Sequence, residues 1–229
     1  MHAQIVVFLH KNIENTYNIM CTRVQNCSED KKMYFFISSD DYFLYFCVDM
    51  MLFQNPIVWL RRIRCRKGYG VHSPFAFDFV TNVIYNTEKY YAYEEMDSAL
   101  RFWQKGRVRS SRHLLFRLSN YRYPKTMYMQ CADKGMEAAC LYGCRNVKLY
   151  GKGTMRGVAD MIVVDRIDEE ALHCIGDGTM LVLSNLRDSQ HYWQRIKDDE
   201  RVTVTFDMYD IGVAFARNDL NKQHYIINW

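Results

Sequence analysis

The sequence predicts an α/β protein in which helices pack on a mainly parallel sheet. With 229 residues, the chain has the length of one domain or of a domain with an appendage. Hydrophobic residues make up 49% and charged residues 24%, proportions that favour a packed globular chain over a disordered or coiled-coil one. After Pro124, short apolar runs alternate with helical patterns, and this alternation indicates βαβ units.

Residues 1–50 differ from the rest of the chain. They contain no glycine and no proline, and they carry four Lys or Arg against six Asp or Glu, whereas the remainder carries 26 against 20. They show aromatic clusters but no helical stripe. We expect this segment to be an atypical leader, either an upstream extension of the domain or a misassigned start.

Residues 51–123 predict a helical cap region. Pro56 suits the first turn of a short helix that ends in a basic run. Ser73 can cap a second helix, which Pro74 can open. A basic helix with leucines on one face follows at about 110–120.

Residues 124–229 predict the sheet domain. Apolar runs indicate strands at 126–131, 146–150, 160–165 and 179–183. Helical patterns lie at 134–142, 168–174 and 189–198. The last apolar runs predict three strands that are antiparallel to one another, at 201–206, 212–216 and 224–227. The prediction is a Rossmann-like sheet with its site beyond the carboxyl ends of the strands, after positions 131, 150, 165 and 183.

The chain carries several motifs in order: RKGYGVHSPFAF at 66–77, YYAY at 90–93, YPKT at 123–126, and VTVTFD at 202–207 with GVAF at 212–215. From about Met51 to its end, the chain resembles in these motifs a bacterial family of class I S-adenosylmethionine-dependent methyltransferases. The resemblance implies a Rossmann-like class I methyltransferase sheet. It also implies S-adenosylmethionine as cofactor. If the protein is active, we expect a small molecule as methyl acceptor.

The resemblance implies where the cofactor would bind. In the family the first strand ends in an acid and a glycine-rich loop, but here Met129 stands at the acid and Cys131 at the first glycine. Gly135 matches a later glycine. The second strand should end in an acid for the ribose hydroxyls, but Tyr150 stands there. Asp165 keeps the acid of a later strand.

The resemblance therefore gives an expected cofactor-binding set of Cys131, Asp133, Gly135, Tyr150 and Asp165. His72 is the candidate general base, and the alternative is a structural histidine in a capped turn. Relatives often carry paired aspartates where this chain has Ser184 and Asn185. Because hard cations favour carboxylates, we expect no metal site.

The link between the second and third predicted strands is short. Eight residues, 151–158, stand where the family has a helix and a strand, and a parallel crossover normally needs about a dozen or more. We therefore expect a sheet shortened by about one helix and one strand. The glycines of this link suggest a phosphate loop as an alternative, but their spacing misses the usual motif and no helix pattern follows.

Our functional prediction is a methyltransferase-like protein with weakened or lost S-adenosylmethionine binding, that is, a pseudoenzyme. Two alternatives stay open. One is an active small-molecule methyltransferase with an altered pocket, and the other is an RNA- or protein-binding module built on the same fold. The net charge of +4 falls short of a nucleic-acid-binding composition, so nucleic acid is not the expected partner.

Other classes lack support in the sequence. The chain has no G-x-S-x-G, H-E-x-x-H or P-loop motif, which argues against the corresponding hydrolases, zinc proteases and NTPases. The eight cysteines form no C-x-x-C pair and match neither a disulfide framework nor a zinc pattern. The start lacks a basic segment, and no apolar run is long enough for a membrane span. We expect a cytoplasmic protein.

Overall fold

The computed structural model describes residues 6–11, 17–22, 32–39, 42–49, 58, 61–99 and 107–229. By its internal contacts the chain divides into two units, Met1–Trp59 and Leu60–Trp229. The first unit holds a four-stranded sheet in the order β2-β1-β3-β4. Its strands are β1 (Val6–Lys11), β2 (Tyr17–Thr22), β3 (Lys32–Ser39) and β4 (Tyr42–Asp49). β1 is antiparallel to β2 and parallel to β3, and β3 is antiparallel to β4.

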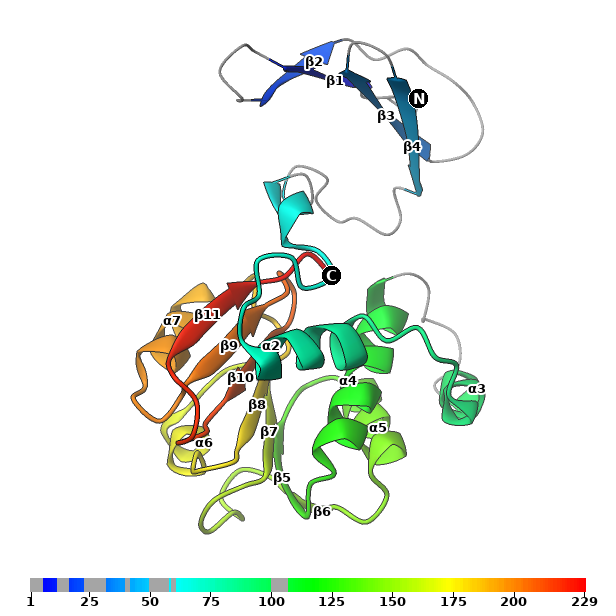
Figure 1. The fold of residues 1–229 in the computed structure, drawn as a ribbon. Coiled ribbons are helices and arrows are strands. Elements are labelled where there is room, and N and C mark those ends of the chain that lie inside the picture. The colour runs from blue at the N-terminus through cyan, green and yellow to red at the C-terminus, as the bar shows by residue number, and fades with distance from the viewer. Residues whose placement is uncertain are drawn as a thin grey trace. The chain divides into compact units, whose positions relative to one another are not determined.

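The second unit is built on a seven-stranded mixed sheet in the order β11-β9-β10-β8-β7-β5-β6 (Figure 1). Its strands are β5 (Thr126–Gln130), β6 (Lys148–Tyr150), β7 (Met161–Val164), β8 (Met180–Leu183), β9 (Val204–Asp207), β10 (Gly212–Phe215) and β11 (Gln223–Ile226). β5 to β8 are parallel to one another. The order β6-β5-β7-β8 is compatible with a Rossmann-like sheet, and the predicted α/β class is confirmed.

Helices precede and separate these strands. They are the 3-10 helix η1 (Ile63–Cys65), α2 (Pro74–Phe79), the π-helix η2 (Val80–Ile84), α3 (Tyr91–Ala99), α4 (Arg107–Arg122), α5 (Lys134–Gly143), α6 (Glu169–His173) and α7 (Gln190–Asp198). Within the described part of the chain, no helix has both the length and the apolar character that crossing a membrane requires.

The helices cover both faces of the sheet. Figure 1 shows α2, α4 and α5 on one face and α6 and α7 on the other. Successive residues of a strand point to opposite faces of the sheet. Met161 and Val163 of β7 pack in the core under α2, α4 and α5, whereas Ile162 packs in the core with Trp193 of α7. The predicted helical cap region thus forms one layer of the sheet domain.

The turn before α2 forms as predicted. Ser73 Oγ accepts a hydrogen bond from the Ala76 amide at 3.4 Å, and Pro74 stands in the first turn of the helix. α2 continues into η2, and the ring of Phe79 packs 4.9 Å from that of Phe206 on β9, measured between centroids. Of the helix predicted to begin at Pro56, the structure describes position 58 and residues 61–67, where 58 and 61 are helical and the basic end contains η1.

The pairing of β11 differs from the prediction that the last three strands are mutually antiparallel. β9 and β10 are antiparallel, but β11 pairs with β9 in parallel. The reason is that β10 lies between β8 and β9 and has no free edge. After β10 the chain must therefore cross β9 and pair with the outer edge of β9. Both β9 and β11 run opposite to β10, so β11 is parallel to β9.

The link between β6 and β7 contains no helix, as predicted. It forms turns, in which the Gly153 amide donates to both carboxylate oxygens of Glu170 at 2.7 and 2.9 Å. Because this amide is bound to a carboxylate and the link enters a strand, it lacks the geometry of a phosphate loop. β6 is the edge of the sheet.

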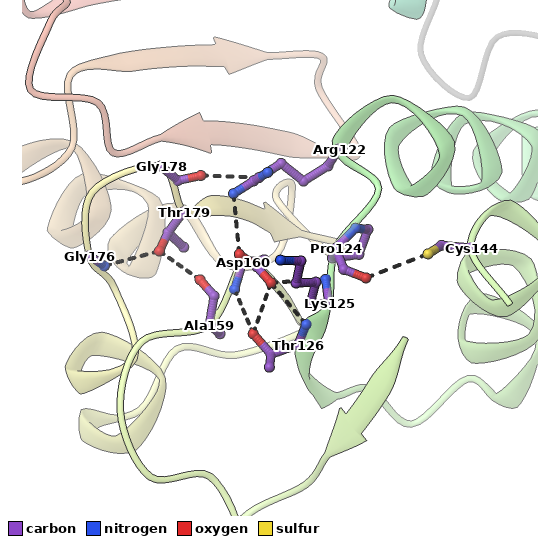
Figure 2. Close-up of polar contacts among 10 residues, drawn as sticks. All are labelled: Arg122, Pro124, Lys125, Thr126, Cys144, Ala159, Asp160, Gly176, Gly178 and Thr179. Carbon is purple, nitrogen blue, oxygen red and sulfur yellow. Dashed lines mark hydrogen bonds and ion pairs between the residues drawn. The ribbon is translucent and has the colours of Figure 1, made fainter. Parts of the chain in front are cut away.

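A carboxylate fastens the amino-terminal ends of β5 and β7 to each other (Figure 2). Asp160 Oδ2 accepts hydrogen bonds from the amides of Lys125 and Thr126, both at 2.9 Å, and from Thr126 Oγ1 at 3.1 Å. Arg122 of α4 adds an ion pair at 3.4 Å. Burial acts to raise the pKa of Asp160, but these hydrogen bonds outweigh it and hold the pKa below its ordinary value.

Asp160→Asn should lower the free energy of unfolding by about 1–2 kcal/mol at pH 7, because an amide cannot accept all these bonds. Since the folded-state pKa is lowered, the stabilising effect of the carboxylate is present above its unfolded pKa and is lost as pH falls through the folded pKa. Urea denaturation of both proteins at pH 7 and below pH 4 measures this, and the difference should shrink in acid. Glu200→Gln, on an exposed side chain, is the matched control. An equal loss at both pH values would contradict this role of Asp160.

Candidate functional site

A cleft of about 600 Å³ lies at the carboxyl ends of β5, β6 and β7. It sits where the strand order reverses, because the chain leaves β5 towards β6 on one side and later returns to place β7 on the other. This reversal is where open α/β sheets bind ligands. The lining residues come from these strand ends and from the start of α5, and they are Met129, Gln130, Cys131, Ala132, Lys134, Glu137, Leu149, Tyr150, Gly151, Asp165 and Arg166.

Cys131 contributes a neutral thiol to the cleft. Its Sγ donates to the Val163 carbonyl at 3.4 Å and lies 3.9 Å from Ser184 Oγ. Burial raises the pKa of the Cys131 thiol to about 12. Since only a thiolate is strongly nucleophilic, this cysteine is a packing group of the wall and not a candidate nucleophile.

Tyr150 and Asp165 also line the cleft. Asp165 follows β7, and its Oδ2 accepts a weak hydrogen bond from the Ala132 amide at 3.4 Å, which ties the loop after β5 to the end of β7. Tyr150 is the last residue of β6. The structure therefore brings Cys131, Tyr150 and Asp165 to one cleft from three strand ends.

Asp133 and Gly135 are engaged elsewhere and are not among the lining residues. Asp133 caps α5, with its Oδ1 accepting from the Gly135 amide at 2.7 Å. Both carboxylate oxygens also lie 3.2 Å from a guanidinium nitrogen of Arg112 on α4. A Cβ at position 135 would stand only 2.3 Å from that guanidinium. The missing side chain of Gly135 thus makes room for Arg112.

His72 lies apart from this cleft. It is exposed and is not among the lining residues. The turn that contains it leads into α2, where the ring of Phe75 packs edge-on 5.1 Å from that of Phe215. Phe215 pairs with Met180 at the beginning of β8 and so marks the amino-terminal ends of the parallel strands.

Some polar residues of the cleft were missed by the sequence analysis. Lys134 and Glu137 form an ion pair of 3.0 Å, and their i,i+3 spacing on a predicted helix was the available signal. Gln130 accepts a hydrogen bond from the Tyr128 hydroxyl at 3.2 Å, a contact between alternate residues of one strand. Among the residues that the structure describes, no group of His, Cys, Asp and Glu is arranged to hold a metal ion.

No family model, curated protein or solved structure in the comparisons matches this chain.

Proposed function

We propose that the protein is a class I methyltransferase-like pseudoenzyme, whose cleft binds S-adenosylmethionine weakly or not at all. The observation that carries the proposal is the position and lining of the cleft. It lies at the reversal of strand order, where the resemblance expects the cofactor, and it is lined there by Cys131 and Tyr150. No helix lies between β6 and β7, which supports a sheet that is shortened at the β6 edge, beside the cleft.

The residues present do not fit the cofactor. A thiol occupies the position where the family needs bare backbone, and burial keeps that thiol in the wall. The Asp133 carboxylate is already bound by the Gly135 amide and by Arg112. Tyr150 supplies a phenol where a carboxylate would accept two hydrogen bonds from a ribose. The thiol obstructs the approach of the cofactor to the backbone, and the other two positions offer fewer polar contacts, so affinity should fall by more than one of these differences alone would cause.

Isothermal titration of the full chain with S-adenosylmethionine should give no saturable heat at ligand concentrations up to about 1 mM, corresponding to binding weaker than about 4 kcal/mol. S-adenosylhomocysteine, the demethylated product, serves as a second ligand. A dissociation constant in the micromolar range for either ligand would overturn the proposal.

A working small-molecule methyltransferase with an altered pocket is the competing function, and the size of the cleft favours it. About 600 Å³ lies within the usual range for a site that takes a small ligand. In that case Asp165 and Tyr150 would contact the cofactor in place of the missing groups. A rise in melting temperature with S-adenosylhomocysteine would support this function, and no shift would exclude it.

A further inference from the structure

A second cavity lies at the opposite, amino-terminal ends of the parallel strands. Its volume is about 280 Å³, and we call it the aromatic-arginine pocket after its lining residues, Phe75, Tyr121, Arg122, Gly178, Phe215 and Arg217. Gly178 precedes β8, Phe215 ends β10 and Arg122 ends α4. The pocket is therefore separate from the cleft at the carboxyl ends.

Aromatic rings form fixed walls of this pocket. Phe75 and Phe215 meet edge-on with centroids 5.1 Å apart. Phe79 is completely buried and packs against the rings of both Phe215 and Tyr121, at 4.9 and 5.4 Å. Because Phe79 belongs to the main core, these rings are held in place without a ligand, and a flat apolar group can enter at little cost in ordering.

Two guanidinium groups complete the lining. Arg122 donates from Nε to the Gly178 carbonyl at 3.1 Å and pairs with Asp160 (Figure 2). Arg217 uses Nε and one terminal nitrogen to bind Asp219, and its guanidinium lies 4.8 Å from the centroid of Phe75. On each arginine the second terminal nitrogen, Nη1, has no hydrogen-bond partner among the described residues. Neither partner carboxylate lines the pocket.

The hydroxyl of Tyr121 lies within the field of both arginines. Burial and then the charge of Asp78 raise the pKa of Tyr121, while Arg217 and Arg122 act against that rise. Asp177 also contributes a negative charge near Arg217. The phenol therefore stays protonated at neutral pH and can donate a hydrogen bond.

We propose that the aromatic-arginine pocket binds a small aromatic carboxylate. The ring would lie against Phe75 and Phe215, and the carboxylate would accept hydrogen bonds from the free nitrogens of Arg122 and Arg217. A single ring with its acid suits about 280 Å³. Each arginine offers one free nitrogen and stays paired with an acid, so the site suits a monoanion better than a phosphate dianion.

The first test is a titration of the full chain with benzoate, followed by ¹H–¹⁵N NMR. We expect saturable shifts with a dissociation constant near or below about 1 mM. Benzamide, which lacks the charge, and acetate, which lacks the ring, should each bind at least about tenfold more weakly. No saturation with benzoate, equal binding of either analogue, or tighter binding of inorganic phosphate would overturn the proposal.

Two variants test the site in opposite directions. Arg217→Gln removes one donor charge and should weaken benzoate binding by about tenfold. Asp219→Asn removes the exposed partner of Arg217 and should strengthen benzoate binding by about threefold. It should perturb the fold little. Arg145→Gln, in an exposed ion pair with Glu95, is the matched control and should change nothing. Unchanged affinity in both Arg217→Gln and Asp219→Asn would contradict the proposal.

Discussion

Gly143→Ala should destabilise the Leu60–Trp229 unit by about 3 kcal/mol. Gly143 ends α5 where that helix crosses α4, and a Cβ there would stand 2.4 Å from the Phe116 carbonyl oxygen and 2.9 Å from the Ser119 Cβ. The first of these atoms is backbone, so no side-chain rotation can relieve the contact. Ser119 Oγ also donates to the Cys140 carbonyl at 2.7 Å, which holds the two helices at this distance.

Urea denaturation followed by circular dichroism measures the effect of Gly143→Ala. Gly151→Ala is the matched control, because a Cβ at position 151 would meet nothing within 4 Å and should change the stability by less than about 0.5 kcal/mol. Equal stability of the two variants would show that the close approach of α4 and α5 does not constrain the fold.

Arg117→Met should cost about 3–4 kcal/mol of unfolding free energy. The Arg117 side chain is buried and donates to the carbonyls of Val83 at 2.8 Å and Ile84 at 3.0 Å, the last two residues of η2. A third bond of 3.3 Å reaches the Tyr93 hydroxyl. Methionine fills much of the volume but leaves two buried carbonyls without their donors. Carbonyls at the end of a helix have no donor within the helix to replace them.

The same denaturation experiment tests this role. Arg117→Lys keeps the charge but not the forked donors, and its stability should fall between those of the parent and Arg117→Met. Arg109→Met removes an exposed partner of Asp97 and should cost less than about 1 kcal/mol. If Arg117→Met were as mild as Arg109→Met, the buried bonds to η2 would not matter for stability.

Local signals predicted most of the elements. Ser73 and Pro74 indicate the start of a helix, because the geometry of the cap and of the first turn depends on neighbouring residues alone. The short 151–158 link predicted an absent helix because chain length limits what can fit. The parallel pairing of β11 could not be predicted in this way, since it depends on which sheet edge the earlier strands leave free.

The position of the cleft could also be inferred from the order of the predicted strands. Cys131, Tyr150 and Asp165 follow parallel strands, and the ends of such strands meet at one edge of the sheet. The partnership of Asp133 with Arg112 could not be foreseen, because it joins α4 to the start of α5 with no sequence pattern linking the two. The only local hint was the suitability of an aspartate before a helix as its cap.

We propose that the side chains at positions 131 and 150 weaken the binding of S-adenosylmethionine and its demethylated product in this cleft. The most direct measurement is isothermal titration of S-adenosylhomocysteine into the parent protein and the double variant Cys131→Gly, Tyr150→Asp. We expect no saturable binding by the parent at ligand concentrations up to about 1 mM. In the variant we expect a dissociation constant at least about tenfold below that limit, because the two changes supply a carboxylate acceptor and remove a side chain from the loop. Micromolar binding by the parent, or no gain in a variant that remains folded, would contradict the claim.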